Sequence, residues 1–274
     1  MYKRIANPVN KDITQLLKRK PKTVNNIKYI NNKSVLKGVS IITCTCKLNS
    51  LNTIINNYTR QKYSNKELIV VINNNTIDLN NWTMETEKYE TIKIFQIDEA
   101  YTLGECLNYA VEQSKYYIVA KFDDDDYYGP EYLLNSIRLF DTTKADVIGK
   151  ATYFIYFKQS DQLAISRNGK ENSYVNFLAG PTLIFNKKVF AKVKFRKLNL
   201  GEDKHFLQDC LSVNFKLYSS DRYDFLYYRQ ESKENHTWKI EDERFINRCK
   251  LLCKIKNDNS YVNIVNRSTS NKII

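Results

Sequence analysis

The sequence of 274 residues is poor in glycine, proline and histidine, with seven, four and two of them. It contains no Gly/Ser linker and no internal repeat, so nothing in it marks a cut between two domains. Residues 43–50, which follow the first apolar run, contain no glycine. This absence argues against the Gly-rich phosphate loop that a nucleotidyltransferase of this layout should carry near its first strand.

Long apolar runs are also missing. None approaches the roughly 18–20 residues that a membrane-spanning helix needs. The start of the sequence, MYKRIANPVNKD, lacks the apolar core of a signal peptide. We therefore expect a cytoplasmic protein, with peripheral contact at the inner face of the membrane as a further hypothesis.

Cysteine is present but dispersed. The six cysteines lie mostly in apolar stretches, which favours reduced thiols over a disulfide framework. A zinc site built from Cys44, Cys46, Cys249 and Cys253 is disfavoured, because neither pair has the usual gap of two residues.

Basic residues outnumber acidic ones, and the formal net charge is +13. The lysines are spread along the chain, with local density at 18–20 and 192–197. A basic protein attracts polyanions, so nucleic acid, anionic lipid and phosphorylated substrates are all compatible with this charge.

The pattern of apolar residues changes near residue 38. Residues 1–37 are rich in Asn and Lys and predict an N-terminal arm. After them, short apolar runs alternate with amphipathic segments, which is typical of an α/β fold with a mixed, mostly parallel sheet flanked by helices. We expect one domain over 38–256 and a polar tail that frays over 257–274. The expected elements of the first half are 39–46, 51–58, 68–72, 92–97, 103–113 and 116–122.

The second half predicts more strands and mixed or antiparallel pairing. One long β-rich run covers 146–157, and two helices are expected at 204–214 and 240–255, the latter closing the domain. The further strands are expected at 162–166, 182–185, 216–219 and 225–229.

Four consecutive aspartates, residues 123–126, directly follow the strand expected at 116–122. Ligands bind at the carboxyl ends of strands in open α/β sheets. Adjacent carboxylates repel one another unless a cation neutralises them, and hard oxygen ligands suit Mg²⁺ or Mn²⁺. Because side chains alternate along a strand, Asp123 and Asp125 are the expected pair on one ion. Asp126 is expected only to begin the next helix.

Several segments together resemble glycosyltransferase family 2, the inverting enzymes of GT-A fold. They occur in the family's order and are VSIITCT (39–45), LIVVINNNTID (68–78), LGECLNYA (103–110), DDDD (123–126), GPT (180–182) and GED (201–203). Further on, YYR (227–229) and HTW (236–238) are similar to bacterial members that act on cell-surface or spore polymers. The sequence departs from the family at Cys44, where proline is usual, and at Asn73 and Asn74, where aspartates are usual.

The resemblance implies transfer of a sugar from a nucleoside diphosphate sugar, preferably UDP-linked, to a hydroxyl of a bacterial surface or spore polysaccharide or of a lipid-linked acceptor. It implies Asp203 as general base and Glu202 as the residue that orients either the acceptor or the water shell of the metal. Mn²⁺ or Mg²⁺ would be held by Asp123, Asp125 and His236. The expected donor contacts, including the cations nearest the phosphates, are Thr43, Thr45, Asn73, Asn74, Asp124, Lys121, Lys150 and Arg229. An amide at 73 or 74 can still accept and donate hydrogen bonds to a base.

Two other classes of protein stay open. One is a nucleotidyltransferase or other phosphate-processing enzyme, which also uses paired acids. The other is a nucleotide-sugar or polyanion binding protein without transferase activity, since 20 tyrosines and 13 phenylalanines offer stacking surfaces. A protein that only binds polyanions or sugar nucleotides would not need Glu202 and Asp203, so their presence favours the transferase. We therefore expect a sugar nucleotide as partner and no nucleic acid.

Overall fold

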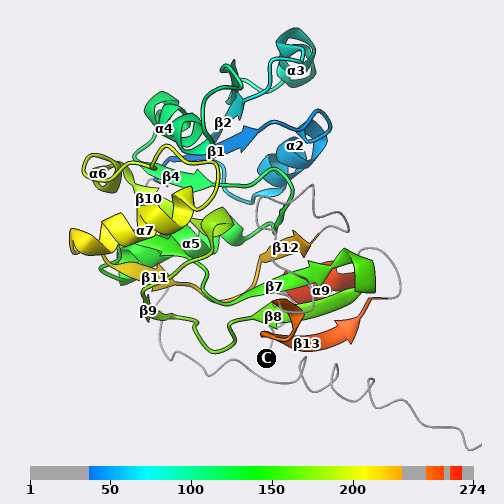
Figure 1. Ribbon diagram of the computed structural model, residues 1–274, viewed down its shortest axis with the longest axis vertical. Coiled ribbons are helices and arrows are strands. Elements are labelled where there is room, and N and C mark those ends of the chain that lie inside the picture. The colour runs from blue at the N-terminus through cyan, green and yellow to red at the C-terminus, as the bar shows by residue number, and fades with distance from the viewer. Residues whose placement is uncertain (1–36, 230–244, 256–259, 267–274) are drawn as a thin grey trace, which may run out of the picture.

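The computed structural model describes residues 37–229, 245–255 and 260–266, which form two β-sheets with helices packed on them (Figure 1). The larger sheet has eight strands in the order β3-β2-β1-β4-β10-β6-β11-β9. These are β1 (Val39–Thr45), β2 (Lys66–Ile72), β3 (Ile92–Gln96), β4 (Ile118–Lys121), β6 (Val147–Gly149), β9 (Ser173–Val175), β10 (Ile184–Asn186) and β11 (Leu217–Ser219). Strands β3, β2, β1 and β4 pair in parallel with one another, while β10 is antiparallel to both β4 and β6. The predicted mixed, mostly parallel sheet is confirmed.

The smaller sheet has five strands in the order β13-β8-β7-β12-β5. They are β5 (Tyr127–Tyr128), β7 (Tyr153–Phe157), β8 (Gln162–Ser166), β12 (Phe225–Arg229) and β13 (Cys249–Lys254). The helices are α2 (Leu51–Arg60), α3 (Leu79–Thr86), α4 (Leu103–Gln113), α5 (Tyr132–Thr142), α6 (Lys187–Phe190), α7 (Glu202–Ser212) and α9 (Ser260–Val265), with short 3₁₀ turns η1 (Lys158–Ser160) and η2 (Gly180–Thr182). Among the described residues, no helix combines the length and apolarity needed to cross a bilayer.

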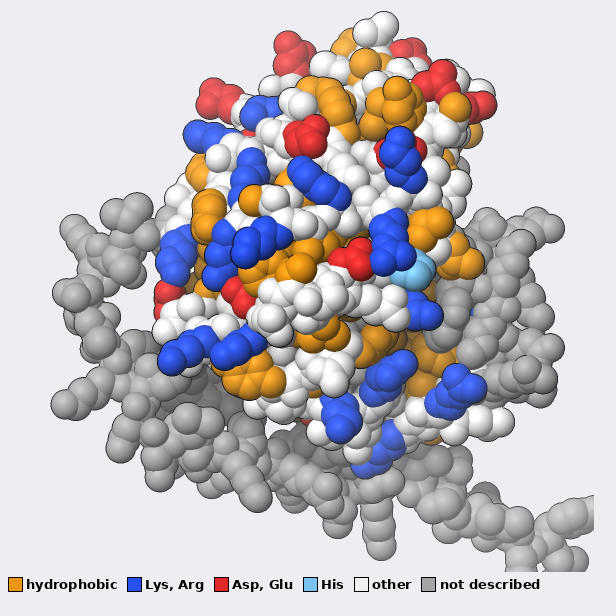
Figure 2. Space-filling model, turned by 60° about the vertical axis from the view of Figure 1, so that its left-hand side comes forward, with side chains coloured by type: hydrophobic (Ala, Val, Ile, Leu, Met, Phe, Trp, Pro, Cys, Tyr) orange, Lys and Arg blue, Asp and Glu red, His pale blue; other side chains and the backbone are white. Residues whose placement is uncertain are grey.

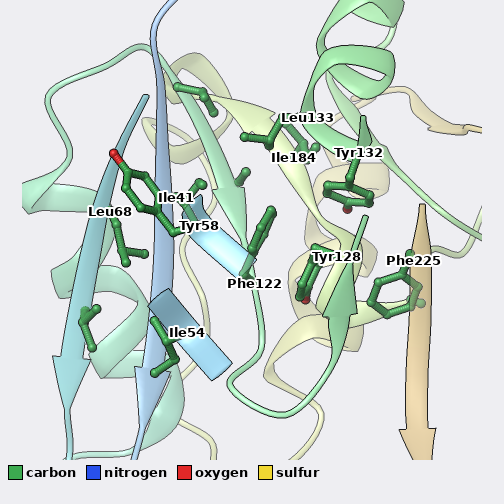
Figure 3. Close-up of a cluster of buried hydrophobic side chains, with 14 of the residues drawn as sticks. Ile41, Ile54, Tyr58, Leu68, Phe122, Tyr128, Tyr132, Leu133, Ile184 and Phe225 are labelled. Carbon is green, nitrogen blue, oxygen red and sulfur yellow. The ribbon is translucent and has the colours of Figure 1, made fainter. Parts of the chain in front are cut away.

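Both faces of the larger sheet are covered, which explains the near-continuous apolar runs of its strands. Neighbouring residues of β1 point to opposite faces, so Ile41 joins a core with α2 and α5, whereas Ile42 joins a core with α4, α6 and α7. Figure 3 shows part of the first core, where Ile54 and Tyr58 of α2 lie beside Ile41 and Leu68.

Two expected elements in the middle of the chain differ from the structure. The run at 146–157 is divided between β6 and β7, which belong to different sheets. The chain leaves the larger sheet here because the backbone N–H groups of Lys150 and Ala151 donate to the side-chain oxygens of Thr182 and Ser219. The strand expected at 182–185 begins later, at Ile184, after the 3₁₀ turn η2.

The C-terminal part also differs from its prediction. The helix expected at 240–255 is the strand β13 over its last residues, while 240–244 lie outside the described residues. The pairing of β13 with β8 shifts between Leu251 and Cys253, and such an irregularity breaks the alternation that identifies a strand. Within the tail expected to fray, α9 packs Tyr261 and Val265 against the smaller sheet.

Candidate active site

The four aspartates lie in a bend between β4 and β5, at the carboxyl end of β4. The bend is closed by Tyr128, whose hydroxyl accepts the backbone N–H of Asp123 at 2.8 Å and donates to the carbonyl of Pro181 at 2.7 Å. The Tyr128 ring stacks on Phe122 with 3.7 Å between centroids, and Figure 3 shows the two rings facing each other. Because the acids are not in an extended strand, the alternation used to pair Asp123 with Asp125 does not apply here.

Asp126 does not begin a helix. Helix α5 starts at Tyr132, and Asp126 is buried with 1% of its surface exposed. Its Oδ1 accepts the backbone N–H of Tyr228 at 3.0 Å, whereas its buried Oδ2 has no hydrogen-bond partner among the residues that the structure describes. Burial, followed by the charges of Asp125 and Asp123, raises the pKa of Asp126 well above its usual range. The prediction for Asp126 was therefore wrong, and this acid joins the bend to β12.

Asp124 is tied to the end of β1. Its Oδ2 accepts a hydrogen bond of 2.5 Å from the hydroxyl of Thr45, and its Oδ1 lies 2.8 Å from Nζ of Lys47. The same ammonium lies 2.7 Å from Oδ2 of Asp125. Lys47 was missed in the sequence because its role depends on the pairing of β1 with β4, which no local pattern shows.

Lys121 connects the acidic bend with the Glu-Asp pair at the start of α7. Its ammonium is buried and pairs with Oδ1 of Asp123. Burial lowers the pKa of Lys121, but the charges of Asp123, Glu202 and Asp203 outweigh it and raise that pKa above its usual value. The two acidic motifs, far apart in the sequence, thus form one site around a single lysine.

Glu202 and Asp203 lie in the first turn of α7, after Gly201, which takes a φ of +81° that favours glycine. Glu202 is 6% exposed. Burial raises its pKa to about 7, while Lys121 opposes this rise and Asp203 adds to it. A carboxyl group with a pKa near 7 can gain or lose a proton at physiological pH.

Asp203 packs against Gly180 of η2. A Cβ atom at position 180 would lie 1.8 Å from Oδ2 of Asp203, so only glycine leaves this carboxylate in its place. Since the carbonyl of the next residue, Pro181, accepts from Tyr128, η2 lies between the acidic bend and the start of α7. The segment 180–182 thus belongs to the site.

Three more residues expected to contact the nucleotide sugar lie in or after β1 and β2. Thr43 is a buried residue of β1. Asn73 and Asn74 follow β2 at the same sheet edge as Thr45, and their side-chain amides donate to the carbonyls of Asp98 and Cys46. The structure therefore brings both asparagines to the expected edge.

Lys150 and Arg229 are the two other cations expected near the phosphates. Lys150 is buried, and its ammonium donates to Ser220 at 3.2 Å and to the carbonyl of Asp221 at 2.6 Å, so it stabilises the end of β11. Arg229 ends β12 and is 1% exposed. His236 lies outside the described residues.

A cleft of about 360 Å³ adjoins the bend on the side of α2. This volume is within the range of ligand pockets. Asp125 and Asp126 contribute to its wall, as do two cations and several tyrosines from α2, β5, β7, β12 and α9. These are Arg60, Lys158, Tyr127, Tyr156, Tyr228 and Tyr261. Arg60 is held over the ring of Tyr127 at 4.5 Å.

The bend offers two carboxylate oxygens to a divalent cation, one on Asp123 and one on Asp125. The side chains of Asp123 and Asp125 are 32% and 26% exposed, and one oxygen of each has no hydrogen-bond partner among the described residues. Mg²⁺ is commonly held by one or two carboxylates, with phosphate and water as further ligands. In the described part of the chain, no three His, Cys, Asp or Glu side chains are gathered around one point.

Residues 39–198 match the profile described as glycosyl transferase family 2, which covers more than half of the chain. This chain belongs to glycosyl transferase family 2. The matched segment includes the bend and Lys121, and it ends just before Glu202 and Asp203. Comparison with curated proteins gave no match.

Solved structures show the same GT-A fold at low sequence identity. TarS 1–349 of S. aureus in complex with UDP-GlcNAc has a TM-score of 0.57 and 18% identity, over 77% of this chain and 64% of that one. The mannosyltransferase PcManGT of Pyrobaculum calidifontis, in complex with GDP-Man and Mn²⁺, has a TM-score of 0.55 and 13% identity, over 81% and 63%. This chain thus spans less than two thirds of the length of either protein.

Proposed function

We propose that this protein is an inverting glycosyltransferase that moves a sugar from a nucleoside diphosphate sugar to an acceptor hydroxyl. The observation that carries this proposal is that buried Lys121 pairs with Asp123 and is also stabilised by the charges of Glu202 and Asp203, which raise its pKa. One set of acids faces the place for the leaving diphosphate, and the other can accept a proton. A protein that only bound sugar nucleotides would not need the second set.

The residues at the head of α7 supply the base. Asp203 takes the proton of the attacking hydroxyl, and Glu202 beside it orients the acceptor. Gly180 and the turn η2 hold Asp203 in place, since nothing larger than glycine fits there. A base on one face of the sugar and a leaving group on the other give a single displacement, which inverts the anomeric carbon.

The acidic bend serves the leaving group. Departure of a nucleoside diphosphate leaves negative charge on its phosphate, which fixed cations stabilise. When bound, Mn²⁺ or Mg²⁺ at Asp123 and Asp125 would neutralise part of that charge. Lys121 keeps Asp123 oriented from within the protein.

UDP is the proposed nucleotide. Asn73 donates its amide hydrogen to Asp98, and its carbonyl oxygen has no hydrogen-bond partner among the described residues, so it can accept the N3–H of uracil. The complexes of TarS with UDP-GlcNAc and with UDP support this choice, whereas the PcManGT complex holds GDP-Man. The proposed acceptor is a hydroxyl of a bacterial surface or spore polysaccharide, free or lipid-linked, near the inner face of the membrane.

A panel of nucleotide sugars tests this function. Each is added with Mn²⁺, and both the rise in melting temperature and the release of nucleoside diphosphate are followed. We expect UDP-sugars to give both signals, and Asp125→Ala to lose the Mn²⁺-dependent binding of UDP. Thermal shifts without release from any donor would make the protein a binding protein, and neither signal from any donor would refute the proposal.

A further inference from the structure

Lys47 occupies a place in the acidic bend that a cation shared by two carboxylates would take. Its ammonium lies 2.8 Å from Oδ1 of Asp124 and 2.7 Å from Oδ2 of Asp125. The backbone N–H of Lys47 donates to the hydroxyl of Thr45 at 3.0 Å, which fixes the base of the side chain at the end of β1. Asp125, the acid proposed to bind metal, is thus already neutralised by the chain itself.

Lys47 and Lys121 differ in their freedom to leave the acids. The side chain of Lys121 is 4% exposed, so its ammonium is enclosed by the protein beside Asp123. The side chain of Lys47 is 40% exposed. Its four-carbon stem can rotate, and lysine holds its partners as a flexible point charge. Of these two ammonium groups, that of Lys47 is the one that can exchange with another cation.

We propose that Lys47 is an exchangeable counter-ion of the acidic bend and a contact of the donor's diphosphate. Without substrate it neutralises Asp124 and Asp125. When a divalent cation binds Asp125, the ammonium leaves that carboxylate and pairs with the diphosphate oxygens instead. The inference rests on the proposed nucleoside diphosphate donor.

The charges require this exchange. An ammonium and a divalent cation on the same carboxylate would lie only a few ångströms apart, where like charges repel by more than thermal energy even in water. The diphosphate brings negative charge to the same place. Lys47 therefore opposes metal binding before the nucleotide arrives and supports nucleotide binding once the metal is present.

Two binding measurements on the full chain separate these effects. Mn²⁺ binding is followed by electron paramagnetic resonance without nucleotide, and UDP binding is followed by calorimetry at saturating Mn²⁺. For Lys47→Gln we expect Mn²⁺ to bind roughly tenfold more tightly and UDP roughly tenfold more weakly, as removal of one nearby charge implies. Lys47→Arg should keep both affinities close to those of the wild type.

Lys62→Gln is the matched control. Lys62 lies 3.9 Å from Glu131 and its side chain is 61% exposed, so it is also a lysine beside an acid, but outside the bend. Neither affinity should change in this variant, and melting curves should show that all variants fold.

The proposal is overturned by weaker or unchanged Mn²⁺ binding in Lys47→Gln, by unchanged UDP binding, or by the absence of Mn²⁺ binding in both proteins. Opposite shifts of the two affinities would support it even if no nucleotide sugar were cleaved. In that case the proposed transferase activity alone would fail.

Discussion

At the scale of single residues, Glu202 is a buried carboxyl group whose pKa is raised by its surroundings. It binds its proton more tightly in the folded protein, with a pKa of about 7, than in the unfolded chain, where the ordinary value is 4.5. The folded state therefore loses stability as the pH rises from about 4.5 to about 7.

Glu202→Gln should remove this pH dependence. At pH 8 the variant should be more stable than the wild type by on the order of 3 kcal/mol, and at pH 4 the difference should vanish. Denaturant unfolding across this pH range measures both. Glu112→Gln, at an exposed acid paired with Lys194, is the control that should leave the profile unchanged. The same slope in Glu202→Gln and in the wild type would contradict the buried position of this carboxyl.

Gly180 is the second residue whose role follows directly from distance. Alanine at 180 would force the carboxylate of Asp203 to move, because the added carbon would lie 1.8 Å from Oδ2. A displaced base of about 1 Å can cost roughly 100-fold in rate. We expect Gly180→Ala to slow transfer to this extent while UDP binding, measured by calorimetry, changes little. Transfer at the rate of the wild type would show that Asp203 does not act from this position.

At the scale of elements, the bend is held by a hydroxyl from β5. Tyr128→Phe removes the partner of the Asp123 N–H and of the Pro181 carbonyl, both in buried surroundings. We expect a loss of stability of about 1–3 kcal/mol and weaker Mn²⁺ binding, because Asp123 is no longer fixed.

Tyr58→Phe is the comparison for this prediction. The hydroxyl of Tyr58 also makes two hydrogen bonds, to the carbonyl of Lys66 and to Thr91, but far from the bend along the sheet. This variant should lose stability without a change in Mn²⁺ affinity. Equal Mn²⁺ affinity in both variants would mean that Tyr128 does not shape the metal site.

The elements also show what the sequence could predict. Helix α4 and strands β8 and β12 have the predicted bounds, because each has a regular pattern of apolar residues over its whole length. The division of 146–157 could not be predicted, since it depends on hydroxyls of Thr182 and Ser219 that are distant in sequence.

The site was predicted to a similar degree. The acids were visible as motifs, but the sequence did not predict that Lys121 would connect the two sets. The counter-ion Lys47 was not visible, because its contacts arise only when β1 and β4 lie side by side.

At the scale of the whole molecule, the positive charge is distributed along the chain, and part of it is paired locally with acids. Figure 2 shows lysine and arginine side chains scattered over one face, with acidic side chains among them. Four basic residues of the segment 188–197 each pair with an acid. These pairs are Lys188–Asp146, Lys194–Glu112, Arg196–Asp209 and Lys197–Glu105. Because the bases of this segment are paired, we expect attraction to a membrane to depend on the overall charge of the chain, +13, rather than on the segment 188–197.

Sedimentation with vesicles measures this attraction. We expect the full chain to bind vesicles containing phosphatidylserine at low ionic strength, to lose most of this binding near 0.15 M salt, where the screening length is about 8 Å, and to ignore neutral vesicles. Absence of binding to anionic vesicles at low salt would refute the proposed peripheral contact.

The most direct test of sugar transfer by this site compares UDP release by the wild type and by Asp203→Asn. Both proteins are given the best UDP-sugar and Mn²⁺ at equal donor occupancy, with water standing in for the acceptor hydroxyl. The wild type should release UDP, and the variant should do so at least about 100-fold more slowly while it binds the donor equally well. Equal release by both proteins, or release by neither with any nucleotide sugar, would contradict the proposed function.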